Sequence, residues 1–422
     1  MSKIDELIKE MCPNGVEYKE LGEIGNFYGG LTGKTKEDFQ NGNKSFITYK
    51  NVYSNISLDI EPIETVKIKE NENQRTLEYG DIIFTGSSET PEECGFSSVV
   101  TKYPTKELYL NSFCFFLRLH NVNILDPNFS KHIFRDHKLR IQIIRTAQGV
   151  TRFNVSKEKM AKIKIPIPPL PIQREIVRIL DSFTELTKEL TKELTKRNKQ
   201  YEYYRDYLLS FKENTDVKNV PLGDIAKFVY GYTDKAKETG SARFIRITDI
   251  SEDGRLNTYD AKYVELTEES KKYLLKKGDL LLARTGATYG KTLYFEADEP
   301  AVYASFLIKI ILDNSVIKNR YYWHFSKSSL YWEQAERYVS KGGQQQFNTN
   351  AVSRVKVPIP SLEVQDRIIY VLDNFDSICS DLKIGLPAEI EARQKQYEYY
   401  RDMLLAFAEK GEIIPDRQTD KQ

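Results

Sequence analysis

The chain has 422 residues, of which 40% are hydrophobic and 29% are charged, and its formal net charge at pH 7 is +1. This length is ample for two or three domains with separate cores. No run of about 18 apolar residues is present, which argues against a membrane-spanning helix, and the N-terminal residues lack the pattern of a signal peptide. The four cysteines and four histidines have no metal-site spacing, so we expect reduced thiols in a cytoplasmic protein without a bound metal.

A first globular module is predicted over residues 1–168. Residues 82–84, 97–100 and 110–119 are rich in β-branched, aromatic and other apolar side chains, which is typical of strands. Glycine-containing pairs between such runs predict turns. Residues 131–164 contain ten Lys or Arg against two acidic residues, a net charge of +8. This cluster predicts a locally basic surface, with an ordinary solvated face as the alternative.

A long helix is predicted over residues 169–213. Pro171 suits its first turn, where a missing N–H costs nothing, and apolar residues then recur at steps of three or four up to Leu208. This stripe is about 40 residues long, or roughly 60 Å. The tetrad Thr-Lys-Glu-Leu occurs twice within it, at residues 187–190 and 191–194. Adding or deleting one tetrad would change the helix length by about 6 Å, so the run is a candidate spacer, with a solvated Lys/Glu face as the alternative.

A second module is predicted over residues 214–360, followed by a second long helix over residues 361–412 and a tail over residues 413–422. The module ends in another basic cluster, because residues 316–356 contain seven Lys or Arg against two acidic residues, a net charge of +5. A break or kink is expected in the second helix near residues 385–387, where a glycine and a proline disfavour helical structure.

The two halves of the chain repeat one another. Lys-Gln-Tyr-Glu-Tyr-Tyr-Arg-Asp occurs at residues 199–206 and again at 395–402, Pro-Ile-Pro occurs at 166–168 and 358–360, and shorter matches keep the same order. We therefore predict an α+β fold in which two similar mixed α/β globular domains are held apart by two long helices. The helices would form an antiparallel coiled coil, so that the chain has an internal pseudo-twofold repeat. Two helices that each pack on their own domain are the alternative.

Enzyme motifs fail in this sequence. Residues 286–292 and 29–35 look like phosphate-binding loops, but three residues separate their glycines where four are needed. Asp-Pro-Asn-Phe at residues 126–129 approaches the Asn/Asp-Pro-Pro-aromatic motif of DNA amino-methyltransferases but lacks the second proline. No nucleophile has a plausible base partner. We predict no catalytic residue, no metal site and no cofactor bound by this chain.

The remaining features favour contact with DNA. Residues 148–153 and 341–347 lie at matching positions in the two halves, inside the basic clusters, and both combine glycine with Gln or Arg. Glycine allows close backbone approach, Gln and Arg can pair with adenine and guanine edges, and Lys or Arg can hold phosphates. For any single residue, a surface or turn role is the alternative. The candidate DNA-binding residues are Lys34, Lys50, Asn51, Gln148, Thr151, Arg152, Arg246, Thr248, Arg284, Thr285, Tyr289, Lys291, Lys341, Gln344, Gln345 and Gln346.

Together these features resemble the specificity subunit of type I restriction–modification systems. The resemblance covers nearly the whole chain. It is carried by Cys-Pro-Asn-Gly-Val-Glu-Tyr-Lys at residues 12–19, the strand-like runs that begin with Gly-Asp at residues 80–83 and 278–281, the Pro-Ile-Pro helix entries and the doubled octapeptide. It implies that the two modules are target-recognition domains, each binding half of an interrupted double-stranded DNA sequence. It also implies that the helices space these domains and dock two modification (methyltransferase) subunits, which restriction (endonuclease and translocase) subunits then join.

The same resemblance implies that this chain is a non-catalytic subunit. Methyl transfer and cleavage would belong to the partners, which would use S-adenosylmethionine, ATP and Mg²⁺. A diverged DNA methyltransferase or nuclease and a coiled-coil protein scaffold remain as alternatives. The repeated helix end supplies the candidates for partner binding, although the tyrosines could equally pack inside the coil: Tyr201, Tyr204, Arg205, Tyr397, Tyr400 and Arg401.

Overall fold

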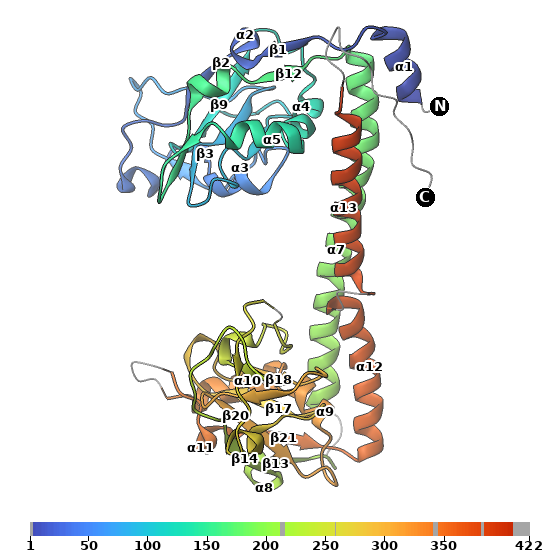
Figure 1. Cartoon of the computed structure of the whole chain (residues 1–422). Coiled ribbons are helices and arrows are strands. Elements are labelled where there is room, and N and C mark those ends of the chain that lie inside the picture. The colour runs from blue at the N-terminus through green and yellow to red at the C-terminus, as the bar shows by residue number, and fades with distance from the viewer. Residues whose placement is uncertain (1–2, 212–215, 258, 341–344, 381–383, 408–422) are drawn as a thin grey trace. The chain divides into compact units, whose positions relative to one another are not determined.

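The computed structural model describes residues 3–211, 216–257, 259–340, 345–380 and 384–407. The chain divides into two compact units. Unit 1 consists of Met1–Lys188 with Glu391–Gln422, and unit 2 consists of Glu189–Ile390. Each unit contains a globular domain of mixed helices and strands together with segments of two long helices (Figure 1).

The domain of unit 1 is built on a four-stranded antiparallel sheet. Its strands lie in the order β2-β9-β5-β7, and they are β2 (Gly25–Gly29), β9 (Cys114–Leu119), β5 (Ile82–Thr85) and β7 (Ser97–Val99). Two three-stranded sheets accompany it: β4-β3-β8, from β4 (Thr65–Val66), β3 (Lys44–Ile47) and β8 (Leu108–Leu110), and β10-β11-β6, from β10 (Ala147–Gln148), β11 (Phe153–Val155) and β6 (Ser87–Ser88). Strand β1 (Tyr18–Glu20) pairs with β12 (Lys164–Pro166). The short helices are α1 (Lys3–Met11), α2 (Leu21–Ile24), η1 (Lys36–Phe39), α3 (Tyr49–Ser54), α4 (Pro127–Ile133), α5 (His137–Ile144) and α6 (Lys157–Ala161).

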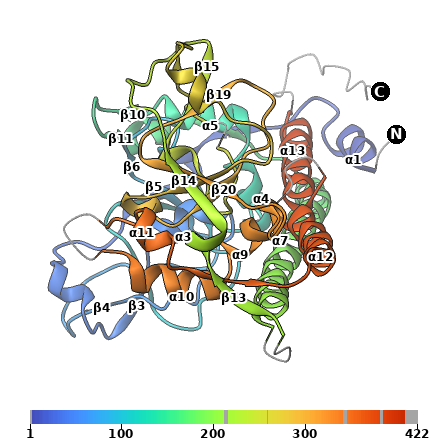
Figure 2. The same ribbon diagram turned by 90° about the horizontal axis from the view of Figure 1, so that it is seen from below.

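The described residues of unit 2 repeat the four-stranded sheet, one of the two three-stranded sheets and the two-stranded pair of unit 1. Its four-stranded sheet has the order β14-β20-β17-β18, from β14 (Ala226–Tyr230), β20 (Leu307–Leu312), β17 (Leu280–Ala283) and β18 (Thr292–Tyr294), and Figure 2 shows β14 beside β20. A second sheet has the order β16-β15-β19, from β16 (Tyr263–Val264), β15 (Ala242–Ile245) and β19 (Ala301–Tyr303), and β13 (Lys218–Pro221) pairs with β21 (Lys356–Ile359). The short helices are α8 (Leu222–Ile225), η2 (Ile247–Asp249), η3 (Ser270–Tyr273), η4 (Gly286–Thr288), α9 (Asn319–Phe325), α10 (Ser329–Tyr338) and α11 (Thr349–Val352). The fold is therefore α+β with two similar domains.

Three long helices carry the repeated helical sequences. The first is α7 (Leu170–Ser210), and the others are α12 (Leu362–Ser380) and α13 (Leu386–Leu404). The sequence predicts a break near residues 385–387, and α12 ends before this point while α13 begins within it. Pro387 lies in the first turn of α13, where a backbone N–H would have no hydrogen-bond partner within the helix, so its absence costs nothing. Residues 413–422, predicted as a tail, lie outside the described residues. Within the described part of the chain, no helix combines the length and apolar character that crossing a membrane requires.

Each domain completes its core with helical segments from both repeats. In unit 1, Ile176 and Leu180 of α7 join the core together with Tyr397 and Leu404 of α13. In unit 2, Tyr201 and Leu209 of α7 join the core together with Ile368 and Leu372 of α12 (Figures 1 and 2). The apolar stripes were predicted to pack either helix against helix or helix against domain. Each helical segment does both, because it packs on a domain and on another helix. Aromatic stacking fixes the helix pairs, with Phe183 on Tyr400 in unit 1 and Phe375 on Tyr204 in unit 2.

A buried glutamine fastens the start of each long helix to its domain. In unit 1, Gln173 accepts a hydrogen bond from the backbone N–H of Asp126 (2.8 Å) and donates to the carbonyls of Ile124 and Pro168. In unit 2, Gln365 makes the equivalent three bonds, to the N–H of Lys318 and the carbonyls of Val316 and Pro360. Both glutamines are fully buried. Since an unpaired buried backbone group is costly, these bonds fix the entry of the helix relative to α4 or α9.

A buried histidine in each unit joins three parts of the chain. In unit 1, His132 of α4 contacts Asp181 of α7 through Nε2 (2.7 Å) and the hydroxyl of Tyr397 of α13 through Nδ1 (2.9 Å). Burial raises the pKa of Tyr397 to about 12, so its hydroxyl stays protonated near neutral pH. A neutral imidazole satisfies the whole arrangement if Nε2–H donates to the carboxylate and Nδ1 accepts from the tyrosine hydroxyl.

Unit 2 contains the same two histidine contacts. His324 of α9 contacts Asp373 of α12 (2.7 Å) and the hydroxyl of Tyr201 of α7 (3.2 Å). Asp373 also accepts from Arg320 (2.7 Å), which, together with the histidine, keeps the pKa of this carboxyl below its usual value despite burial. Burial lowers the pKa of His324 to about 4, and the pKa of His132 is lowered for the same reason. Both histidines are therefore neutral in the folded protein at neutral pH.

The depressed histidine pKa predicts that unit 2 loses stability in mild acid. Between pH 6.5 and about 4 the unfolded chain binds a proton that folded His324 excludes, so the free energy of unfolding falls as the pH falls, by up to about 3 kcal/mol. The measurement is hydrogen exchange of α9 in the intact chain across this pH range, corrected for intrinsic exchange rates. His324→Gln should flatten the dependence in unit 2 and leave that of unit 1. An unchanged slope in this variant would show that other groups control the acid transition.

Candidate nucleic-acid interface

The turn between β10 and β11 presents a row of exposed residues in unit 1. Gln148, Thr151 and Arg152 are all exposed. Gly149 has a φ of +145°, and a Cβ at this position would lie 1.9 Å from the carbonyl oxygen of Arg152, so only glycine fits. Strand β11 also pairs with β6, which places the turn beside Ser87. The sheet therefore holds three predicted contact residues in one exposed turn.

Lys50 and Arg152 line a single hollow of about 530 Å³ in unit 1. Arg152 donates from Nη2 to Ser87 Oγ (3.1 Å), and its guanidinium lies 5.2 Å from the centre of the Phe113 ring. Helix α3, which carries Lys50, is attached at the same place, because the hydroxyl of Tyr49 donates to the carbonyl of Ser87 (2.9 Å). The hollow thus combines two cations with aromatic and hydroxyl groups.

The hollow also contains acidic acceptors, Glu89 and Glu93. Hydrogen bonds from Ser88 (2.9 Å) and Tyr53 (3.0 Å) lower the pKa of Glu93, which keeps this carboxyl ionised at neutral pH. A carboxylate repels phosphates but can accept from the amino group of cytosine, whereas Arg and Lys donate to guanine or to phosphate. The arrangement therefore offers both donors and acceptors to base edges.

Unit 2 brings its own candidates together around the end of β17. Thr285 pairs with Gln346 in an isolated antiparallel bridge, and its hydroxyl donates to the carbonyl of Gln345 (3.2 Å). Both glutamines are exposed, whereas Thr285 is buried and holds the backbone. The Arg284 guanidinium lies 5.4 Å from the ring centres of both Tyr230 and Phe306. Tyr289 packs edge-on against Phe347 and Trp332 beneath this surface.

Several predicted contact residues are engaged elsewhere in their domains. Lys34 forms an ion pair with Glu72 (2.5 Å) and its side chain is only 6% exposed. The side chain of Asn51 bonds to the backbone of Asp59 on both its amide atoms, and Arg246 pairs with Asp249 and Asp260. Lys291 lines a different hollow, with Tyr201 and Lys327 among its other walls. Lys341 and Gln344 lie outside the described residues.

Lys50 and Thr248 occupy equivalent positions, since each stands three residues after its matching strand, β3 or β15. Thr248 is exposed, and the preceding Ile247 lies within 3.8 Å of the place that a Cβ on Gly286 would take. The glycine-rich segment that resembles a phosphate-binding loop is a turn between the antiparallel strands β17 and β18, with only the short helix η4 inside it. No long helix N-terminus follows it to hold a phosphate. Within the described residues, no cluster of His, Cys, Asp or Glu could hold a metal ion.

Two exposed aromatic residues beside these surfaces were not predicted from the sequence. Phe113 stands immediately before β9 and Phe306 immediately before β20, which are equivalent strands. The signal is a Ser-Phe pair at residues 112–113 and 305–306. Apolar residues surround both pairs, so the sequence pattern merges them with the buried strands that follow.

The repeated helix ends divide their residues between packing and exposure. Tyr201 and Tyr397 are buried against the histidines, which favours the core-packing interpretation for these two. Arg205 pairs with the neighbouring Asp206 and Arg401 with Asp402. Four further side chains on the same helix ends are exposed: Tyr203, Tyr207, Tyr399 and Met403. Tyr204 and Tyr400 are also exposed, although each stacks on a phenylalanine.

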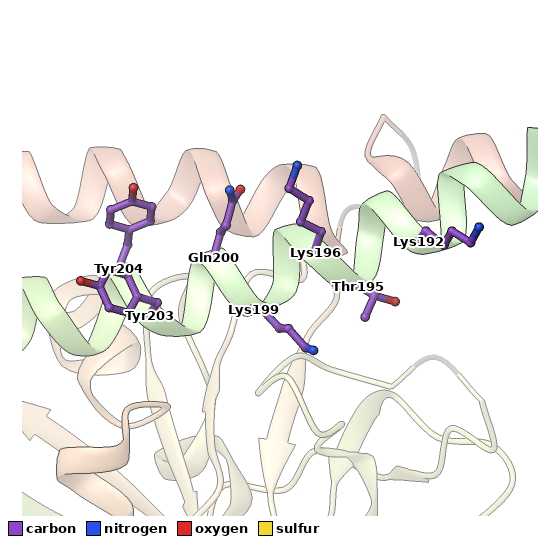
Figure 3. A pocket seen from close by; sticks show the side chains of 7 residues that line it. All are labelled: Lys192, Thr195, Lys196, Lys199, Gln200, Tyr203 and Tyr204. Carbon is purple, nitrogen blue, oxygen red and sulfur yellow. The ribbon is translucent and has the colours of Figure 1, made fainter.

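In unit 2 an open hollow lies along this exposed face of α7. All seven residues that line it come from this one helix, and they include Tyr203, Tyr204, Lys196 and Lys199 (Figure 3). Tyr203 also stacks on Tyr207 with ring planes 6° apart. The helix end thus presents aromatic rings and lysines together on a surface that its own domain leaves uncovered.

Comparisons with known proteins agree with the duplicated architecture. The family model described as "Type I restriction modification DNA specificity domain" matches twice, at residues 13–198 and 214–392. A putative type I restriction enzyme specificity subunit of Haemophilus influenzae is 37% identical over 271 residues, which are 62% of this chain and 68% of the relative. The EcoR124I/EcoR124II specificity subunit of Escherichia coli is 35% identical over 60% of this chain and 65% of its own length, so that match spans slightly less than two thirds of the relative.

A solved structure supports the fold. A chain from a study of complex assembly and conformational transition in a type I restriction–modification system aligns with a TM-score of 0.60. The alignment covers 93% of this chain and 98% of that chain at 18% sequence identity.

Proposed function

The chain belongs to the type I restriction modification DNA specificity family, and from this premise we propose that each of its two domains reads one half of an interrupted DNA target. The chain would be the sequence-specific subunit of a complex in which partner subunits methylate and cleave. S-adenosylmethionine, ATP and Mg²⁺ would be bound by those partners. The helical segments between the domains would set the number of unread base pairs between the half-sites.

One observation carries this proposal: the two domains share a backbone frame but place different side chains at equivalent positions. Lys50 in the first domain corresponds to Thr248 in the second. Arg152 stands before Phe153 of β11, whereas Gln346 stands before Phe347. Arg favours guanine and Gln favours adenine when they contact base edges. One docking geometry with two sets of contacts is what two different half-sites require.

The repeated helix ends support the proposal of two identical partners. The exposed residues Tyr203 and Tyr207 in unit 2 correspond to Tyr399 and Met403 in unit 1. Exposed aromatic side chains on a helix are suited to a protein interface, because they bury a large area at low entropic cost. Since the same surface occurs once in each unit, two copies of one modification subunit would dock in equivalent ways. Among the predicted partner residues, this leaves Tyr204 and Tyr400 as contributors at the edge of that surface.

The nearly neutral net charge agrees with a subunit that shares its DNA with partners. DNA affinity that is independent of sequence grows with the number of phosphates neutralised. A chain with 62 basic and 61 acidic residues supplies little of this term by itself. The isolated chain should therefore bind DNA weakly, with the modification subunits closing around the duplex.

Methylation mapping tests the proposed function. DNA from cells that express this chain together with its modification subunit should carry methylated adenines in one interrupted motif, and cells lacking either protein should carry none. Methylation by the chain alone would instead indicate a diverged methyltransferase. Absence of methylation with a confirmed partner present would favour a protein scaffold.

The repeated Thr-Lys-Glu-Leu tetrads predict a change in the spacer of the methylated motif, which the same methylation mapping would detect. Inserting one more Thr-Lys-Glu-Leu unit after residue 194 lengthens α7 by about 6 Å, close to the rise of two base pairs. Both half-sites should stay the same while the unread spacer between them becomes longer. Insertion of four alanines at the same place is the matched control, and it should act equally if helix length alone is responsible. A change in either half-site sequence would contradict the assignment of this segment as a spacer.

Removing the charge of exposed Arg152 should weaken DNA binding, whereas removing the charge of ion-paired Lys34 should not. Arg152→Gln should weaken binding of the assembled complex to its target about tenfold and reduce the salt dependence of log Kd by about one unit if the arginine contacts a phosphate. Lys34→Gln should leave both quantities unchanged, because Glu72 already neutralises this lysine. Titrations at several salt concentrations measure both effects. Equal losses in the two variants would refute the placement of the interface at the β10–β11 turn.

A further inference from the structure

Phe113 and Phe306 are exposed aromatic side chains with the same backbone anchor. Phe113 is 54% exposed and Phe306 is 51% exposed. The carbonyl oxygen of Phe113 accepts from the N–H of Gly86 (2.7 Å), and that of Phe306 accepts from the N–H of Arg284 (3.2 Å). Gly86 and Arg284 both follow the equivalent strands β5 and β17 closely. The backbone of each phenylalanine is therefore held where the two central strands of its four-stranded sheet end or begin.

Each ring lies against an arginine, but the two arginines come from different parts of the domain. Arg152 belongs to the β10–β11 turn of unit 1, whereas Arg284 directly follows β17 in unit 2. The distances from guanidinium to ring centre are 5.2 and 5.4 Å. A hydroxyl holds the first arginine, through Ser87 (3.1 Å), and a carbonyl holds the second, through Ser305 (3.1 Å). The same pairing thus arises from two unrelated sequence positions.

Folding alone does not account for this recurrence. A single exposed phenylalanine is ordinary on a protein surface. Two at the same structural position, each with a fixed guanidinium beside it, keep an apolar ring and a hydrogen-bonding cation together in water. Among the described contacts, the guanidinium of Arg152 uses Nε and Nη2, both on one serine hydroxyl. An arginine has five N–H donors, so others remain for a ligand.

The combination suits a nucleobase. An aromatic ring can pack on the face of a base, insert between base pairs or contact the methyl group of thymine, and arginine supplies bonds to guanine or phosphate alongside. In unit 1 the ring and its arginine line the same hollow as Lys50 and Glu93. In unit 2 they adjoin Thr285, whose backbone holds Gln346. The rings therefore lie at the surfaces that carry the predicted hydrogen-bonding contacts.

We propose that Phe113 and Phe306 are equivalent base-contacting residues, each packing on a nucleobase in the half-site that its own domain reads. Arg152 and Arg284 hold the rings in place and bind the neighbouring base edge or phosphate. The proposal rests on the proposed function and deepens it by naming a specificity-determining residue in each domain. The aromatic contact is common to both domains, and the surrounding polar residues differ.

The test uses the full chain assembled with its modification subunits. Kd is measured for the mapped target and for duplexes with single base-pair changes in one half-site or the other. Phe113→Ala should weaken target binding about tenfold or more, and should reduce discrimination against changes in one half-site only. Phe306→Ala should have the same effect on the other half-site. Because both rings are exposed, thermal unfolding of each variant should match that of the parent chain.

Matched controls distinguish a base contact from a general loss of apolar surface. Tyr103→Ala and Tyr259→Ala remove rings that are 74% and 81% exposed, one in each domain, and should leave binding unchanged. Phe113→Trp should retain much of the affinity, because a larger ring can still pack on a base. A 2-aminopurine substituted in each half-site reports insertion between bases by increased fluorescence, and uracil in place of thymine reports a methyl contact by weakened binding.

The outcomes separate the two proposals. If the parent complex methylates no interrupted motif, the proposed function fails, and the base contacts fail with it because they require a half-site that the domain reads. If the parent complex reads its motif and both alanine variants keep its affinity and discrimination, the proposed function stands and the base contacts are refuted. Equal losses on target and unrelated DNA would also refute them, because a base contact must act on sequence discrimination.

Discussion

A neutral histidine buried in each unit holds together the three chain segments on which the rest of the structure depends. In unit 1, His132 bonds to Asp181 at the beginning of one long helix and to Tyr397, 265 residues away, at the end of another. Unit 2 repeats this arrangement with His324, Asp373 and Tyr201. The polar contact is directional, and the surrounding apolar core is not. The histidine therefore fixes which helical segments close each core, while burial of Ile176, Leu180 and their counterparts provides most of the stabilisation.

This arrangement makes the sequence repeat and the structural unit different objects. A sequence repeat contains one domain and the helix that follows it, whereas a compact unit contains one domain, the beginning of its own helix and the end of the other. The octapeptide that recurs at residues 199–206 and 395–402 is thus conserved between repeats for a physical reason, because each copy must fit the same histidine pocket. Its buried tyrosine packs inward, and Tyr203 and Tyr399 on its outer side remain exposed.

The same frame permits variation at the candidate DNA surface. The buried contacts of the glutamine and histidine sites are nearly identical in the two units, while the exposed positions differ, as Lys50 and Thr248 do. Backbone bonds at the strand ends hold the exposed turns without specifying their side chains. Sequence changes at the surface therefore have little effect on stability, since surface substitutions away from buried features typically alter the free energy of unfolding by less than about 0.5 kcal/mol. The exposed surface can therefore vary while the buried core stays the same.

Much of the architecture could be predicted because local sequence patterns and the internal repeat determine it. The helical stripe after Pro171 and the ordered matches between the halves lead to the α+β fold with two similar domains. The candidate site was harder, since pairing between distant residues decides it. Lys34 looks like a free cation in sequence but is neutralised by Glu72, and the packing of His132 on Tyr397 depends on tertiary contact. Phe113 was hidden inside an apolar run, because the Ser-Phe pair that marks it in both halves does not by itself reveal whether the ring is exposed or buried.

Hydrogen exchange on the Tyr397→Phe variant tests the central claim most directly. Removing one hydroxyl leaves Nδ1 of buried His132 without its donor, which should destabilise unit 1 by about 1–3 kcal/mol. Amides of α4, residues 127–133, should then exchange faster by about five- to 150-fold where exchange follows local opening. Amides of α9 should be unaffected, and Tyr201→Phe should reverse the pattern. Faster exchange in α9 after the Tyr397 substitution, or no change in α4, would contradict the assignment of the helix end to unit 1.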